Sequence, residues 1–164
     1  MKFYEALTYV NENFYKPNHF AIKAIREEAQ NSAYGAGIFQ LNSKSVRFRV
    51  AKTTPNKVGQ FVSFWEKDAT HKNQAFSYGK ATDLLVINTF TSTNRFGQFI
   101  FPKEVLLKQK ILKTETTKGK MAIRVYPIWD KPTSTQAIET QKWQLEYFVE
   151  LNNLSHQKFL KLYS

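Results

Sequence analysis

The stretch VRFRVAKTTPNKVGQFVSFW, from Val46 to Trp65, begins with a regular strand pattern and then departs from it. Three apolar residues alternate with Arg47 and Arg49, which predicts a β-strand with one apolar face and one basic outer face. Extending the same alternation by two residues places Lys52 in phase with the apolar side. A lysine at that position is either a strand-end residue whose stem lies on apolar neighbours or part of a site.

The residues around this strand predict a β-hairpin. GIFQL precedes it, and a turn over 42–45 joins the two segments. Pro55 cannot donate a ladder hydrogen bond, so the second strand is expected to end there. Phe61, Phe64 and Trp65 then recur at spacings of three and four, which predicts a short helix over Lys57–Asp68.

The remaining pattern predicts a mixed α/β (α+β) fold in a single domain over residues 1–164, with a central mixed β-sheet flanked by helices. An amphipathic helix is expected over residues 2–15, and residues 19–30 fit a helix or a strand, with composition favouring the helix. Further expected elements are strands over 84–90, 96–101 and 121–129, a helix after Pro102, and a helix over 135–151. That last helix should bury Ile138, Leu145, Phe148 and Val149, and carry a polar and aromatic stripe of Gln136, Thr140, Trp143 and Tyr147.

The chain is strongly basic. Its 24 Lys and Arg against 13 Asp and Glu give a net charge of +11, and 15% of its residues are aromatic. Positive charge attracts a polyanion, and aromatic rings stack on bases, so this composition favours a nucleic-acid partner.

Other classes of protein are disfavoured by what the sequence lacks. There is no cysteine, which excludes disulfides and thiol catalysis and fits a cytoplasmic protein. The three histidines are far apart, no long apolar run is present, and the glycines form no phosphate-binding loop. We therefore expect no cofactor, no metal site and no membrane partner.

The order of hairpin, helix and strand over 38–90 resembles the core of the restriction-endonuclease-like fold. In that fold an acidic residue and a lysine two positions later share one strand face, where carboxylates hold Mg²⁺. Here the triplet is Val50, Ala51 and Lys52, so the lysine is present and the acid is absent. Glu27 and Glu28 remain as upstream acids, which leaves a divergent metal-dependent nuclease as an alternative to a binding protein that uses Lys52 for phosphate.

Four blocks of the sequence resemble the MepB-like family of small bacterial proteins over about 34–148. They are AKTTPNKVGQFVSFW, GQFIFPK, RVYPIW and QAIETQKWQ, in the family's order. The tail WEKD after the first block carries two acids where a more basic segment is expected. The resemblance implies a cytosolic protein of mixed α/β fold that binds nucleic acid or a nucleotide.

Carried over by position, the resemblance implies a set of characteristic polar residues, which we expect to converge on one ligand-binding pocket. We expect no catalytic residue, because the acids of a nuclease site are missing. The characteristic polar residues are Arg49, Lys52, Thr54, Lys57, Gln60, Lys103, Arg124, Tyr126, Gln136, Gln141 and Trp143. The cations would meet phosphates, Trp129 would add a further aromatic face, and an amide of Gln136 or Gln141 would hydrogen-bond a base. A protein-interaction module with an acidic partner is the third hypothesis.

Overall fold

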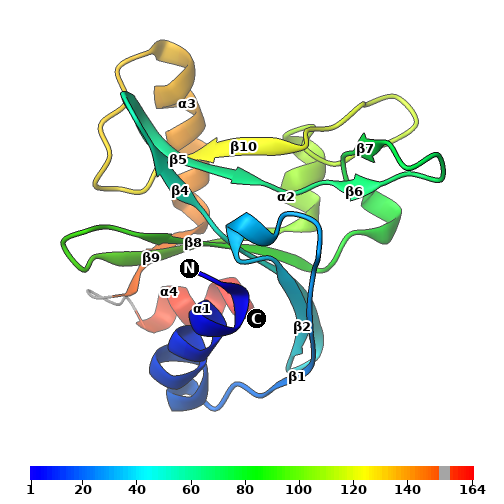
Figure 1. Cartoon of the computed structure of the whole chain (residues 1–164). Helices are drawn as coiled ribbons and strands as arrows, with labels where there is room; N and C mark the ends of the chain where they lie inside the picture. Colours follow the sequence, from blue (N-terminus) through cyan, green and yellow to red (C-terminus); the bar gives the residue numbers. More distant parts are fainter. Residues whose placement is uncertain (152–155) are drawn as a thin grey trace.

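A six-stranded mixed sheet forms the centre of the protein, which we describe from a computed structural model over residues 1–151 and 156–164 (Figure 1). The strand order is β1-β2-β3-β8-β9-β11, and all neighbours are antiparallel except β3 and β8, which run parallel. The strands are β1 (Ile22–Glu27), β2 (Gly37–Leu41), β3 (Lys44–Val50), β8 (Leu84–Phe90), β9 (Phe96–Pro102) and β11 (Phe148–Glu150). The predicted single-domain mixed α+β fold is thereby confirmed.

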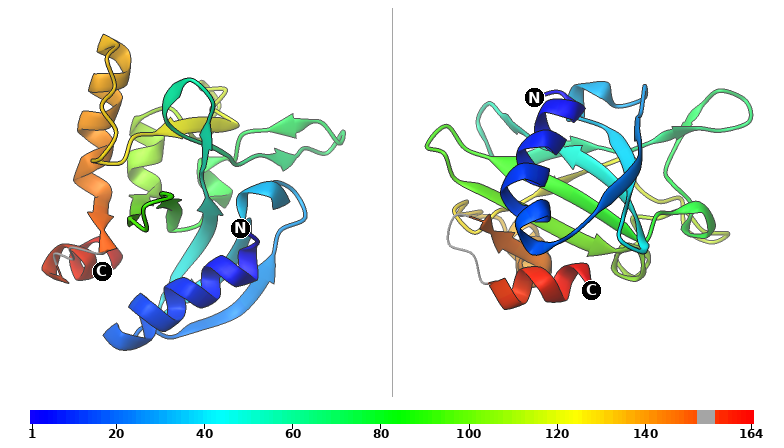
Figure 2. Two further views of the ribbon diagram at one scale, coloured as in Figure 1. Left: turned by 60° about the vertical axis from the view of Figure 1, so that its left-hand side comes forward. Right: turned by 90° about the horizontal axis from the view of Figure 1, so that it is seen from below.

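A second layer covers one face of this sheet (Figure 2). It contains a three-stranded antiparallel sheet in the order β10-β5-β4, a small hairpin and two helices. These elements are β4 (Lys52–Thr54), β5 (Lys57–Ser63), β6 (Glu66–Lys67), β7 (Asn73–Gln74), β10 (Ala122–Val125), α2 (Lys103–Lys108) and α3 (Thr135–Gln144). Three single 3-10 turns lie in connections to the central sheet: η3 (Ser32–Tyr34) joins β1 to β2, η4 (Tyr78–Lys80) joins β7 to β8, and η5 (Leu145–Tyr147) joins α3 to β11.

The opposite face of the central sheet is covered by α1 (Phe3–Val10) and α4 (His156–Tyr163). In α1, apolar side chains recur at helical spacing and all of them are buried against the sheet. The helix continues through the π-helical turn η1 (Asn11–Tyr15) into the 3-10 turn η2 (Lys16–Asn18), where Pro17 and a left-handed His19 stop it. The predicted helix over 2–15 is confirmed.

Both faces of the central sheet are therefore buried, and this explains the continuous apolar run of β8. Leu84 and Val86 pack on the α1 and α4 side, whereas Leu85 and Ile87 pack into the second layer. Strands buried on both faces carry apolar runs instead of alternation. The predicted basic outer face of β3 is wrong for the same reason, because Arg49 and most of Arg47 lie inside the second layer.

The chain crosses from one sheet to the other at Ala51. β3 ends at Val50, the Ala51 N–H donates to Asn88 O at 2.9 Å, and Lys52 begins β4 of the three-stranded sheet. The alternation of β3 therefore stops before Lys52, whose side chain is exposed. Placing Lys52 in phase with the core face was wrong, because it belongs to another strand.

Two predicted helices are strands in the structure. Residues 22–27 form the edge strand β1, which pairs with β2 across an irregularity at Ala24, a residue in the left-handed region. Lys57–Ser63 is the middle strand β5, paired on both sides by β4 and β10. The connection from β3 to β8 thus consists of strands and a 3-10 turn, and the helix that the restriction-endonuclease-like comparison required is not formed there.

The predicted long helix over 135–151 ends at Gln144, and its inward residues are placed differently. Ile138 is 47% exposed, while Phe148 and Val149 are buried in β11. Gly97 makes this pairing of β11 with β9 possible, since a Cβ there would lie 2.3 Å from the Phe148 ring. No helix among the residues that the structure describes has the length and apolar character to cross a bilayer.

A buried chain of hydrogen bonds ties α4 to the central sheet. The hydroxyls of Tyr15 and Tyr163 lie 2.8 Å apart, and Tyr163 donates to Gln98 Oε1 at 2.7 Å. Gln98 in turn donates to Asn88 Oδ1, and Asn88 donates to Arg49 O, each at 2.8 Å. Burial raises the pKa of both tyrosines, so they remain neutral donors at physiological pH.

Removing the Tyr163 hydroxyl should destabilise the protein, because it leaves Gln98 Oε1 buried without a donor. We expect Tyr163→Phe to lower the free energy of unfolding by about 1–3 kcal/mol, measured by urea denaturation. Tyr4→Phe is the matched control, since Tyr4 is 54% exposed and should lose almost nothing. Equal stability of the two variants would contradict this role of Tyr163.

Candidate functional site

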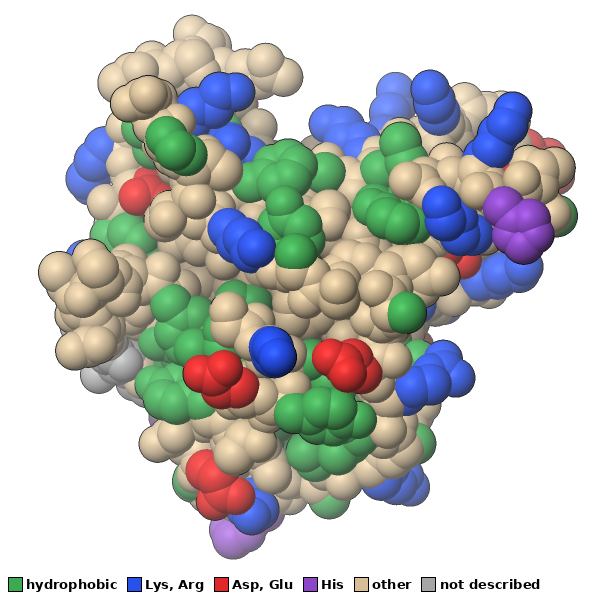
Figure 3. Space-filling view, viewed as in Figure 1, with side chains coloured by type: hydrophobic (Ala, Val, Ile, Leu, Met, Phe, Trp, Pro, Cys, Tyr) green, Lys and Arg blue, Asp and Glu red, His purple; other side chains and the backbone are tan. Residues whose placement is uncertain are grey.

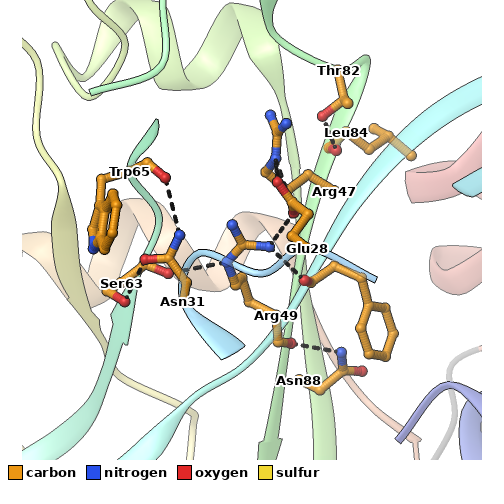
Figure 4. Close-up of polar contacts among 10 residues, drawn as sticks. Glu28, Asn31, Arg47, Arg49, Ser63, Trp65, Thr82, Leu84 and Asn88 are labelled. Carbon is orange, nitrogen blue, oxygen red and sulfur yellow. Dashed lines mark hydrogen bonds and ion pairs between the residues drawn. The ribbon is translucent and has the colours of Figure 1, made fainter. Parts of the chain in front are cut away.

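An ion cluster of Glu28, Arg47 and Arg49 lies where Glu28, directly after β1, reaches across β2 to the arginines of β3 (Figure 4). Arg49 is fully buried, and its Nη1 donates to Glu28 Oε1 at 2.7 Å. Its Nε donates to Ser63 O at 3.1 Å, which links β3 to the end of β5. Arg47 donates to both oxygens of the same carboxylate at 3.3 Å, and its guanidinium lies 3.6 Å from the Phe76 ring centroid.

Burial lowers the pKa of Arg47 and of Arg49, and the Glu28 carboxylate opposes that shift. Removing a charged group from water is costly unless an opposite charge and hydrogen bonds compensate it. The cluster therefore holds its two arginines in place as structural groups. Arg49 has no exposed surface with which to contact a phosphate.

The same geometry bears on the residues considered for a nuclease site. Both oxygens of Glu28 accept hydrogen bonds from arginine, and Glu27 is exposed at the end of β1. Over 1–151 and 156–164, no three His, Asp or Glu side chains lie together as metal ligands would. The carboxylates that the sequence left for a divergent nuclease are thus not gathered around Lys52.

A groove runs between the edge strand β10 and helix α3 and contains a cavity of about 410 Å³. Two cations line it, Lys120 and Arg124, and no Asp or Glu is among its lining residues. Trp143 and Tyr126 contribute aromatic rings to the wall. The other polar lining residues are Gln109, Ser134, Gln136, Thr140 and Gln144.

The groove continues along α3 into a second, more open cavity of about 480 Å³. Gln109, Gln136, Thr140 and Trp143 line both cavities, so Trp143 lies at their junction. The second cavity has mixed charge, with Lys142 beside Glu139 and Glu146. An anionic group is therefore favoured in the first cavity, near Lys120 and Arg124.

Helix α3 is held against β10 by amide side chains instead of an apolar face. Gln144, the one buried residue of the helix, donates to Arg124 O at 3.0 Å and accepts from the Tyr126 N–H at 2.9 Å. Gln141 donates to the carbonyls of Tyr126, Pro127 and Asp130. To bind a base as predicted, the Gln141 amide would have to give up hydrogen bonds to these carbonyls.

Four of the predicted site residues meet in the groove, namely Arg124, Tyr126, Gln136 and Trp143. Two others are buried: Arg49 belongs to the ion cluster, and Gln60 donates to Phe90 O at 3.2 Å. Lys103 begins α2, with its Nζ 5.1 Å from the Tyr78 ring centroid, and Trp129 packs against Phe148. Thr54 and Lys57 are paired at the β4–β5 turn.

Lys52 lies on the outer face of the three-stranded sheet. The strand register places Lys52 opposite Phe61 and Phe61 opposite Arg124, so the three side chains share one face. Lys52 Nζ is 5.1 Å from the Tyr34 ring centroid, and Tyr34 makes an edge contact with Phe61. This row of cations and rings joins the groove at Arg124.

Gly59 allows Arg124 and Tyr126 to pack across β5. Its φ of +86° is unfavourable for residues with a side chain, and a Cβ would lie 2.7 Å from the Tyr126 ring and 2.9 Å from Arg124 Cγ. The guanidinium of Arg124 can then reach the carbonyls of Val58 and Gly59 at 3.4 and 3.3 Å. The glycine of the GQF block therefore positions one wall of the groove.

Comparison with known proteins gives a family and one solved structure. A family model described as MepB-like matches residues 28–150. The chain belongs to the MepB-like family. A solved structure described as the crystal structure of MepB is 36% identical, with a TM-score of 0.80, and the alignment covers 91% of this chain and 98% of that one. No curated protein matches this MepB-like chain.

Sequence reasoning missed several groove residues of this MepB-like protein. Gln144 follows Gln136 and Thr140 of the predicted stripe at intervals of four, so the stripe was a usable signal for it. Lys120 and Gln109 come from segments without periodicity, and only the tertiary fold brings them to β10. Nothing in the sequence pattern marked these two positions.

The ion cluster of this MepB-like protein predicts a large effect for Glu28→Gln. The substitution leaves the fully buried Arg49 and the mostly buried Arg47 without their carboxylate, so we expect the free energy of unfolding to fall by about 3–5 kcal/mol in urea denaturation. The neighbouring exposed Glu27→Gln should change it by less than about 0.5 kcal/mol. Equal losses in the two variants would show that the cluster is not required for stability.

Proposed function

We propose that the protein binds single-stranded nucleic acid, or a nucleotide from it, in the groove between β10 and α3. The observation that carries the proposal is the meeting of Lys120 and Arg124 with the Trp143 ring in a cavity of about 410 Å³ whose lining contains no acid. A positively charged groove with aromatic stacking platforms is how proteins hold single strands. The cations would bind phosphate and the ring would stack on a base.

The wider surface supports the same ligand. Figure 3 shows Lys and Arg side chains around α3 and around the β6–β7 hairpin, with apolar side chains exposed between them. The row of Lys52, Phe61 and Arg124 extends the groove across the three-stranded sheet. A net charge of +11 would further accelerate association with a polyanion.

The test measures binding of fluorescein-labelled ten-residue oligonucleotides, (dT)10 and (rU)10, by fluorescence anisotropy. Lys120→Glu should weaken binding by about tenfold or more, because it places a negative charge beside the phosphates. Lys23→Glu is the matched control: it makes the same charge change at an exposed position in β1, at the other end of the molecule from α3. It should change affinity by less than about threefold, as a general effect of net charge.

Salt dependence and the aromatic contact provide independent checks. Affinity should fall linearly on a double-logarithmic plot against salt concentration, and Lys120→Glu should reduce the slope. Trp143→Leu should weaken binding by about fivefold to a hundredfold, as expected for a lost stacking contact. Salt-independent binding, or equal affinities for Lys120→Glu and Lys23→Glu, would refute a site in the groove.

A further inference from the structure

The floor of the groove is the open edge of strand β10. The register pairs Ile123 with Val62 and Val125 with Gln60, and the Phe64 N–H donates to Met121 O in the same ladder. Because hydrogen-bonding directions alternate along an antiparallel pair, the N–H and C=O groups of Ala122 and Arg124 point away from β5. They point toward the groove, whose lining includes both residues.

Gln144 shows what kind of group fits this edge. Its single planar amide accepts from the Tyr126 N–H at 2.9 Å and donates to Arg124 O at 3.0 Å. At the edge of a strand, the carbonyl of one residue and the N–H of the residue two positions later form a pair of hydrogen-bonding groups. Such a pair can bind any planar group that has a donor next to an acceptor. The Gln144 amide thus fills one carbonyl and N–H pair at the edge of β10, in the way that the hydrogen-bonding edge of a nucleobase would.

The preceding pair on the same edge is open. Within the chain as described, the Ala122 carbonyl and the Arg124 N–H have no hydrogen-bond partner. Both residues are partly exposed, and the cavity of about 410 Å³ lies in front of them. Unpaired backbone groups of this kind bind water or a ligand.

The size of the open edge favours a nucleobase over an added peptide strand. Strand addition gains its affinity from a series of main-chain bonds, and Gln144 already blocks β10 at Arg124 O and Tyr126 N. Within β10 one complete carbonyl and N–H pair remains, from Ala122 O and Arg124 N, with the Ala122 N–H beside it at the start of the strand. This short open edge matches the donor and acceptor on a single base edge. Trp143 lies one residue from Gln144 on α3 and supplies a ring beside the cavity, while Lys120 lies two residues from Ala122.

We infer that the groove reads a nucleobase through its hydrogen-bonding edge, with Ala122 C=O accepting from the base and the Arg124 N–H donating to it. This inference rests on the proposed function and adds the way in which the base is held. For adenine, the N6 amino group would donate to Ala122 O and N1 would accept from the Arg124 N–H. The base would lie in line with the Gln144 amide along the edge of β10.

The experiment varies the base and leaves the protein intact. Fluorescein-labelled (dA)8 is compared with oligonucleotides of the same length built from purine, which lacks the N6 donor, or from 1-deazaadenine, which lacks the N1 acceptor. Each change removes one hydrogen bond, so affinity should fall by about threefold to tenfold. The matched control is 7-deazaadenine, which keeps the N6 and N1 edge and should bind within about twofold of adenine.

Backbone NMR shifts give a second readout at the predicted atoms. Titrating (dA)8 should move the Arg124 amide resonance downfield, and the 1-deazaadenine oligonucleotide should not, while the side-chain amide of Gln144 serves as an internal reference. Equal affinity of all four oligonucleotides would overturn the reading of the base edge and leave the proposed function standing. Failure of every oligonucleotide to bind at low salt would overturn both. If an extended acidic peptide binds and shifts the Arg124 amide resonance, the ligand of this edge is an added peptide strand and the inference of a bound base is wrong.

Discussion

The architecture depends on neutralising one guanidinium inside the protein. Arg49 is fully buried, and Glu28 is the carboxylate that meets it. The contact ties the end of β1 to β3 across β2, and the bond from Arg49 to Ser63 O ties the end of β5 to them as well. Because an uncompensated buried charge is so costly, the three strands are constrained to meet at this point. The same residue thereby links the central sheet to the three-stranded sheet.

Much of the fold was readable from the sequence, because the hairpin and the first helix carry clear periodicity and the strands β8 and β9 are apolar runs of strand length. The segment 57–68 was mispredicted because the spacing of Phe61, Phe64 and Trp65 fits a helix, although Phe64 and Trp65 follow the end of β5. Alternation in β3 showed that Arg47 and Arg49 share a face. The alternation could not show that a second layer covers this face, because the burial of the face depends on contacts with residues far away in the sequence.

The groove was predictable only where a local pattern in the sequence marks its residues. The stripe on α3 identified Gln136, Thr140 and Trp143 together, and they do line one cavity. The expected convergence of lysines was not observed there, because Lys52, Lys57 and Lys103 begin three different elements. Residue type alone also could not separate Gln136, which lines the cavity, from Gln141, whose amide is committed to backbone carbonyls. That difference arises from the turn between β10 and α3.

The crossing at Ala51 determines which wall of the groove can adapt in shape. A single residue connects β3 to β4, its N–H is bonded to β8, and Gln60 joins β5 to the carbonyl of Phe90. Sliding the two sheets against each other would break these buried bonds together. Helix α3 is attached by single side chains instead, namely the amides of Gln141 and Gln144 on the β10 side and the Trp143 ring against Phe101. A change in the shape of the groove would therefore come from the side chains of α3, with β10 acting as the fixed reference surface.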